Sequence, residues 1–154
     1  MFEIVCATGQ IVRYNGSSLL NADLKETNLH RAMLDGYDMQ GCCLNNSNLR
    51  NASMEGTILR NAHLEGAKLM AISARNADFR GATITKAFLN CACLVGSNLE
   101  GADLTDSNLW GADLSGANLK GAILTRVNFE SITFNYETIW PGSFDLNLLR
   151  TVRA

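Results

Sequence analysis

Cysteine is the residue type in this sequence whose spacing most suggests chemistry. The five cysteines include an adjacent pair, Cys42-Cys43, and a second pair, Cys91 and Cys93, separated by one residue. Paired thiolates of this kind bind zinc when four ligands converge in a tetrahedron, and a histidine can complete such a set. Whether these side chains can meet depends on the elements that carry them.

A repeat of five residues dominates the chain. Every fifth position from Leu19 to Phe134, here called a centre, is apolar, and 17 of these 24 centres are leucine. The position two before each centre is Ala, Ser, Thr or Cys in 20 of the 24 units, and the position directly before it is often Asp or Asn. Gly and Asn recur two residues after the centre. A period of five fits neither an α-helix nor a regular strand.

Each unit predicts a very short extended edge followed by a corner. In extended backbone, residues two apart face the same side, so the small residue and the centre both point inward. The Gly or Asn that follows tolerates the positive φ that a tight corner needs. Stacked edges would therefore build a coil with one large and one small side chain inside each edge.

These units resemble the pentapeptide-repeat family. The resemblance is carried by stretches such as Gly101-Ala102-Asp103-Leu104 and by residues 111–119, and it covers residues 17–135. It implies an all-β fold, a right-handed quadrilateral parallel β-helix with four units per coil. Twenty-four units would make about six coils, and the shaft would be roughly 29 Å long at the usual strand spacing of about 4.8 Å.

The two ends of the chain lie outside the regular repeat. A solenoid needs caps, so residues 1–16 predict an N-terminal strand or hairpin and residues 136–154 a C-terminal cap with a short helix. Residues 138–145, Thr-Ile-Trp-Pro-Gly-Ser-Phe-Asp, resemble the closing segment of cyanobacterial members of the family. No signal peptide or long apolar run is visible, and the number of cysteines is odd, so we expect a cytoplasmic protein with no membrane partner.

Among the four units that lack a small residue two before the centre, the units at Ile72 and at Tyr37 are the most informative. At the centre Ala74 the inward partner is Ile72, so large and small have exchanged places and both should face inward at conserved volume. Tyr37 occupies a small-residue position although its centre, Met39, is large. Either the coil widens at Tyr37 or its side chain leaves the interior.

The register separates the residues that chemistry would need to bring together. It directs Cys42 inward and Cys43 outward, and it places Cys91 at a corner two coils away. These thiols therefore cannot converge on one metal ion. His30 and His63 fall on different sides, and neither has the neighbours of a catalytic triad. We therefore predict no catalytic residues, no metal and no cofactor, and a protein that is not an enzyme.

Charge argues against direct binding to nucleic acid or to an anionic membrane. Thirteen Lys and Arg nearly balance fifteen Asp and Glu. Some pentapeptide-repeat proteins present a DNA-like rod to gyrase, and a DNA-mimicking inhibitor or protector of a gyrase-type topoisomerase is the alternative function. Duplex DNA carries one charge per about 1.7 Å, far more than this net charge of −2. The candidate acidic patch consists of Glu100, Asp103, Asp106 and Asp113.

Outward apolar residues indicate a different function. Met70, Phe88 and Trp110 flank centres that the register stacks on one side in consecutive coils. Such a strip marks a partner surface when it is contiguous, whereas side chains that merely cover one another would carry no function. Our first hypothesis is a non-enzymatic scaffold that binds an unidentified protein partner, with a homodimer through an end cap or the apolar strip as one form of it.

Overall fold

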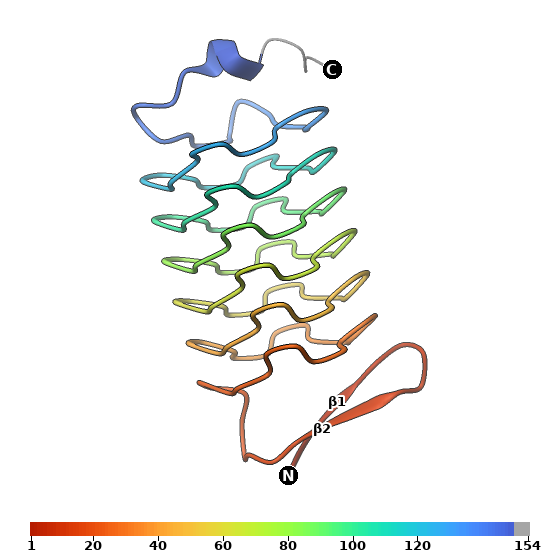
Figure 1. The fold of residues 1–154 in the computed structure, drawn as a ribbon. Coiled ribbons are helices and arrows are strands. Elements are labelled where there is room, and N and C mark those ends of the chain that lie inside the picture. Colours follow the sequence, from red (N-terminus) through yellow and green to blue (C-terminus); the bar gives the residue numbers. More distant parts are fainter. Residues whose placement is uncertain (150–154) are drawn as a thin grey trace.

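The computed structural model describes residues 1–149, and they form a coil that rises steadily from one end of the molecule to the other (Figure 1). Its regular elements are two strands, β1 (Phe2–Val5) and β2 (Ile11–Tyr14), and one 3-10 helix, η1 (Leu146–Leu149). Between them the chain consists of single-residue bridges and turns. In residues 1–149 no helix is long or apolar enough to cross a membrane.

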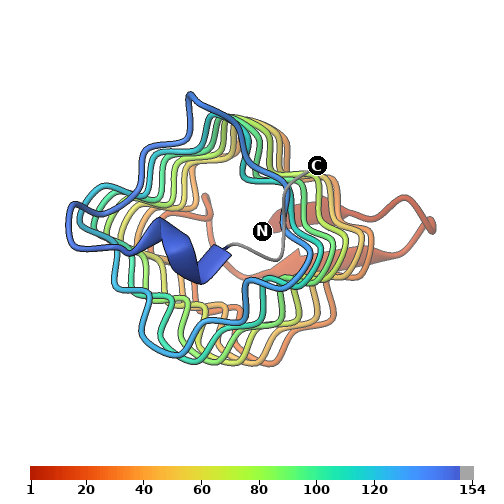
Figure 2. The same ribbon diagram turned by 90° about the horizontal axis from the view of Figure 1, so that it is seen from above.

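Parallel bridges twenty residues apart define the four sides of the coil, which is square in outline when viewed along its axis (Figure 2). Each bridge joins the residue before one centre to its counterpart one coil on, as in Lys68 with Phe88. We name the sides by these ladders: side 1 runs from Asp38 to Ile139, side 2 from Asp23 to Ile123, side 3 from Asn28 to Asn128, and side 4 from Met33 to Thr133.

The corners have the backbone conformation that the repeat predicts. At every corner from residue 21 to residue 131, the residue two after the centre has φ between +54° and +68°. Glycine leaves room for the neighbouring coil: a Cβ at Gly41 would collide with the side-chain oxygen of Asn21 unless that side chain moved. Asparagine in the left-handed region thus pairs with glycine in the coil above it.

The interior holds the two inward columns that the repeat predicts. The centres are almost all fully buried, and the small residues two before them are buried as well. Ile72 is 1% exposed and Ala74 is 0% exposed, so the predicted exchange of large and small on this edge is confirmed. Cys42 is fully buried in a small-residue position, as expected, while Cys43 is half-buried on the outside.

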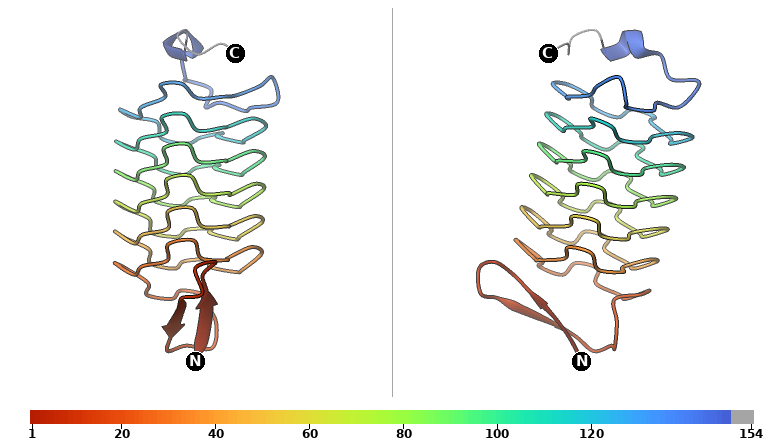
Figure 3. Two further views of the ribbon diagram at one scale, coloured as in Figure 1. Left: turned by 90° about the vertical axis from the view of Figure 1, so that its right-hand side faces the viewer. Right: turned by 180° about the vertical axis from the view of Figure 1, so that it is seen from behind.

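At the N-terminal end, β1 and β2 pair in antiparallel register, with Phe2 opposite Tyr14. An antiparallel bridge between Cys6 and Ala32 fastens this hairpin to the first coil. Tyr37, whose position the sequence left open, is half-buried, and its ring meets the ring of Phe2 edge-on at 5.6 Å between centroids. The hairpin projects from the base of the coil (Figure 3).

At the C-terminal end, the ladder passes residue 135, where the sequence predicts the shaft to stop. Asn118 bridges to Ile139, a step of 21 rather than twenty, and the unit accommodates the extra residue by leaving Tyr136 94% exposed. Thr138 occupies the next small-residue position, and its hydroxyl donates to the Leu114 carbonyl at 2.9 Å. The short helix η1 lies over this last coil, and residues 150–154 of the expected cap fall outside the described residues.

Candidate interaction surface

Two outward slots flank each centre, one residue before it and one after it. Met70 and Trp110 occupy slots after their centres on side 3, and Phe88 occupies a slot before its centre on the same side. The bridges from Lys68 to Phe88 and from Phe88 to Asn108 place the three residues in consecutive coils. The structure therefore puts the predicted strip on a single side.

Exposure distinguishes these three side chains from the buried core beneath them. Phe88 is 45% exposed and Trp110 is 42% exposed, whereas Met70 is half-buried. Asn108 holds the corner that carries Trp110, because its Oδ1 accepts a hydrogen bond from the Trp110 backbone N–H at 3.0 Å. Most units of this side have asparagine in the slot that Phe88 occupies. The Phe88 ring therefore replaces an amide side chain that would accept a hydrogen bond from the backbone of the corner.

The charge of side 3 is a feature that the sequence analysis missed. From Asn28 to Asn128 no outward slot on this side contains Asp or Glu, and the slot after its last centre, Phe129, contains the exposed Glu130. Arg50 and Lys68 are exposed there, and within residues 1–149 neither forms an ion pair. The signal was available, because the same twenty-residue register that groups the apolar residues also groups the charges.

The neighbouring sides have the opposite balance. In the outward slots of side 2 and of side 4, three carboxylates stand against one cation, and on side 2 Lys25 pairs with Asp23 and the corner residue Lys86 pairs with Glu65. Side 1 alternates acid and base along its length. The outward carboxylates are Asp23, Glu65 and Asp103 on side 2, and Asp35, Glu55 and Asp113 on side 4.

The four residues of the candidate acidic patch do not lie together. Glu100 is on side 1, Asp103 is on side 2, and Asp113 is on side 4, across the coil from side 2. Asp106 stands at a corner, where Arg126 Nη2 donates to its Oδ2 at 2.7 Å. That hydrogen bond lowers the pKa of Asp106, so the carboxylate stays ionised and is paired with the Arg126 cation.

The cysteines are separated in the manner that the register predicts. Burial raises the pKa of the Cys42 thiol to about 12, so this thiol is inert at neutral pH. Cys91 is exposed at a corner, and Cys93 is half-buried on side 4. Among the described residues, no three His, Cys, Asp or Glu side chains come close enough to hold a metal ion.

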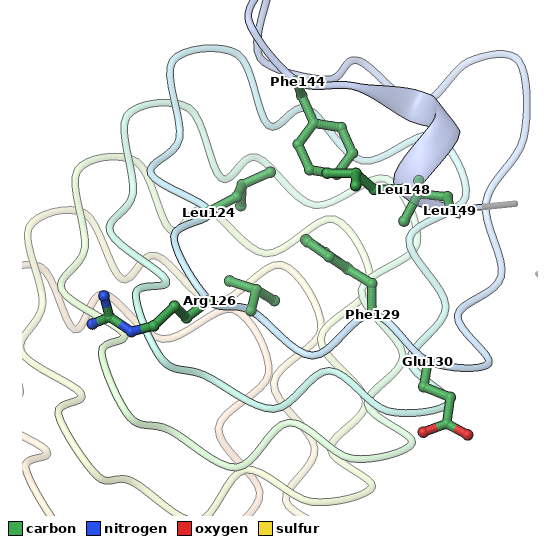
Figure 4. Close-up of a pocket in the computed structure, with 8 residues that line it drawn as sticks. Leu124, Arg126, Phe129, Glu130, Phe144, Leu148 and Leu149 are labelled. Carbon is green, nitrogen blue, oxygen red and sulfur yellow. The ribbon is translucent and has the colours of Figure 1, made fainter. Parts of the chain in front are cut away.

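A cavity of about 400 Å³ lies between the last coil and η1 (Figure 4). Phe129 and Phe144 face each other across it at 5.6 Å between ring centroids, and Trp140 stacks on Phe144 at 4.9 Å. Arg126 and Glu130 are the charged residues at its edge. Its described lining combines apolar side chains with these two charged ones and contains no pairing of a general base with a nucleophile.

Comparison with known proteins identifies the repeat. The model for pentapeptide repeats matches eight copies over residues 15–46, 38–71, 72–101 and 97–135. None of the curated proteins matches the chain. Among solved structures, the chain is 33% identical to the pentapeptide-repeat protein Rfr23 from the cyanobacterium Cyanothece 51142; the match covers 68% of this chain and 64% of that one, with a TM-score of 0.36. The chain thus spans slightly less than two thirds of that relative.

Two further solved structures are similar. QnrB1, a plasmid-mediated fluoroquinolone resistance protein, is 22% identical over 88% of this chain and 75% of its own, with a TM-score of 0.59. HetL from Nostoc sp. strain PCC 7120, involved in heterocyst differentiation regulation, is 23% identical over 79% of this chain and 78% of its own, with a TM-score of 0.28. The likeness to QnrB1 supports the right-handed β-helix fold and says nothing about function.

Proposed function

Because this chain belongs to the pentapeptide-repeat family, we propose that it is a non-enzymatic scaffold whose side 3 binds a protein partner. One observation carries the proposal: two large side chains, Phe88 and Trp110, are each more than two-fifths exposed on side 3, whose outward slots contain no carboxylate before Glu130. Aromatic residues presented on a rigid element are the usual anchors of protein interfaces.

The geometry of the shaft supports binding rather than catalysis. The inward residues fill the coil, and the cavities lined by Phe129 and Phe144 and by Phe2 and Tyr37 lie at its two ends. Family members are generally structural or interaction scaffolds. A repeated edge also presents its side chains at fixed spacing, so a partner surface on it is ordered before binding.

The test compares the loss of outward apolar residues on side 3 with the loss of one outward apolar residue on another side. Phe88→Asn and Trp110→Ser remove the strip, and Asn already occupies most slots of the Phe88 type on side 3. Ile123→Asn is the matched control, because Ile123 is 49% exposed in the same kind of slot on side 2. Tagged proteins would be used to capture partners from a lysate of the native host and compared by quantitative mass spectrometry.

We expect a protein that the wild type and Ile123→Asn both retain and that the Phe88→Asn/Trp110→Ser variant loses. Circular dichroism and thermal unfolding would show that all three proteins keep the fold. The same captured set for all three would refute a partner surface on side 3. Sedimentation velocity on the same variants tests the homodimer, since a monomer unchanged by the substitutions excludes self-association through the strip.

A second candidate draws on the acidic sides. Sides 2 and 4 each have more outward carboxylates than cations, and the chain shares its fold with QnrB1. A DNA-mimicking inhibitor or protector of a gyrase-type topoisomerase would use such surfaces. A supercoiling assay with added protein, with and without a quinolone, decides this candidate: no effect of the protein at tenfold excess over gyrase would eliminate it.

A further inference from the structure

The charged residues of this nearly neutral chain are distributed unevenly among the four sides of the coil. From Asn28 to Asn128 the outward slots of side 3 contain cations, apolar groups, amides and His30, and Glu130 follows one coil after Trp110. On sides 2 and 4 outward carboxylates outnumber outward cations, and side 1 is balanced. The net charge of −2 conceals this division. A partner of side 3 therefore meets the exposed cations Arg50 and Lys68 between two sides on which outward carboxylates outnumber outward cations.

The cationic and apolar groups of side 3 also follow an order along the axis. Arg50 lies one coil before Lys68 and Met70, Phe88 lies one coil after them, and Trp110 one coil further. At about 4.8 Å per coil, Arg50 and Trp110 are roughly 14 Å apart along the axis. An extended polypeptide rises about 3.4 Å per residue, so four or five residues cover this distance.

From this order we infer that side 3 recognises a short acidic segment of a partner polypeptide, with carboxylates at Arg50 and Lys68 followed by aromatic or aliphatic side chains at Met70, Phe88 and Trp110. The inference rests on the proposed function and names the chemistry of its partner. Carboxylates match the two unpaired cations, and the apolar side chains of the segment cover the rings that water now contacts.

The segment binds through side chains rather than as an added strand. The backbone of side 3 is already paired within the coil: Lys68 N donates to the Ser47 carbonyl at 2.9 Å, and Leu69 N donates to the Phe88 carbonyl at 2.8 Å. No row of open N–H and C=O groups remains along this face for strand addition. Specificity must come from charge and from the spacing of the anchors.

Nucleic acid fits the same face less well. Duplex DNA has one phosphate charge per about 1.7 Å, so about eight would lie along the 14 Å from Arg50 to Trp110. Side 3 offers two exposed cations in its slots over that length. A peptide with two or three carboxylates matches this charge, whereas a phosphate backbone exceeds it.

A phage-displayed library of random heptapeptides, selected on the intact protein, provides the probe. The best peptide would be labelled with fluorescein, and its binding measured by anisotropy in 50 mM and 200 mM NaCl. We expect enriched peptides with two or more Asp or Glu residues N- or C-terminal to an aromatic or aliphatic pair. Binding should weaken about tenfold or more in Arg50→Glu/Lys68→Glu, and comparably in Phe88→Asn.

Arg75→Glu is the matched control, because Arg75 is exposed on side 4 and within residues 1–149 forms no ion pair. It should leave the affinity within twofold. The inference is overturned if no peptide is enriched, if the enriched peptides lack acidic residues, if Arg75→Glu weakens binding as much as the double variant, or if a ten-nucleotide oligo-dT binds as tightly as the peptide.

The two proposals can fail separately. A host protein whose capture depends on Phe88 and Trp110 but tolerates Arg50→Glu/Lys68→Glu would preserve the scaffold function and refute an acidic partner. Loss of capture in both variants supports both proposals.

Discussion

At the residue scale, the Asn or Asp directly before many of the centres stabilises the corner that follows the centre. Its side-chain oxygen accepts a hydrogen bond from the backbone N–H two residues on, as Asn48 does from Arg50 and Asp113 from Ser115. This local bond stabilises the turn that the left-handed residue completes. The preference for Asn and Asp at this position is therefore a requirement of the backbone and carries no information about function.

Asp78 shows how the same slot can gain a second role. Arg80 donates to it through Nε and Nη2, at 2.9 and 2.7 Å, and Arg60 Nε donates at 2.6 Å. The hydrogen bonds from Arg80 first, and Arg60 second, lower the pKa of Asp78 to about 2 against the opposing effect of burial. An ordinary aspartate has a pKa of about 3.9.

Since the folded pKa is depressed, the unfolded chain binds this proton at higher pH than the folded chain does. The stabilisation is therefore complete above pH 4 and is lost as the pH falls toward 2. Both arginines are more than a third exposed, so we expect Asp78→Asn to lose about 1–2 kcal/mol at pH 6. In urea unfolding at pH 6, 4 and 2.5, the difference in unfolding free energy between wild type and Asp78→Asn should become smaller as the pH falls. A difference that does not change with pH would contradict this prediction.

The exchange of volumes at Ile72 and Ala74 gives a second test at this scale. Ile72→Ala alone leaves two small side chains on one edge, and we expect it to cost about 2–5 kcal/mol of stability through the cavity it creates. Adding Ala74→Leu restores the usual arrangement and should recover more than half of that loss. Equal stability of the single and double variants, measured by urea unfolding, would show that the two positions do not share a volume.

At the scale of elements, the hairpin β1–β2 closes the end of the coil through Phe2. Its ring covers Tyr37, and Ile4 on the same strand face is fully buried. We predict that Phe2→Ala costs about 1–3 kcal/mol and exposes the first coil, because the coil has no other cover there. Val5→Ala is the control, since Val5 is 40% exposed on the opposite face of β1.

Hydrogen exchange measured by mass spectrometry would localise the effect of Phe2→Ala. Faster exchange in residues 19–40 of Phe2→Ala, with residues 80–120 unchanged, is the expected pattern. Uniform acceleration along the whole chain would mean that the hairpin is required for global folding and is more than a local cap.

At the scale of the whole molecule, the number of repeat units between two residues determines whether they lie on the same side of the coil. One inserted unit of sequence Ala-Asp-Leu-Ser-Gly after Ala71 keeps every inward position inward but moves all later units by one side. Phe88 and Trp110 would then leave the side of Arg50 and Lys68. Four inserted units complete a coil, return the aromatics to side 3, and add about 4.8 Å between the two groups.

Both insertion variants should fold, because each coil contacts only its neighbours, and circular dichroism with sedimentation would establish that. The one-unit variant should lose affinity for the selected acidic peptide by about tenfold or more, and the four-unit variant should bind more tightly than the one-unit variant. Equal affinities would show that the cationic and apolar groups do not act as one surface.

The shaft was predictable from sequence because each unit determines its own conformation. Alternation of small and large inward residues, corner residues and the phase of the repeat are all local, so register and inward residues such as Ile72 and Cys42 follow without tertiary information. The ends were less predictable, because a single extra residue near Tyr136 shifts the register, and the aromatic packing of Trp140 on Phe144 depends on how η1 lies over the last coil.

For the candidate surface, too, some features follow from the local repeat and others depend on the tertiary structure. The sequence by itself determined that Met70, Phe88 and Trp110 share one side, since that follows from a period of twenty. Only the tertiary structure decided which side chains stay exposed, that Arg126 pairs with Asp106, and that Arg50 and Lys68 remain unpaired within the described residues. Exposure and ion pairing depend on where long side chains settle across neighbouring coils, and no local rule of the repeat specifies that.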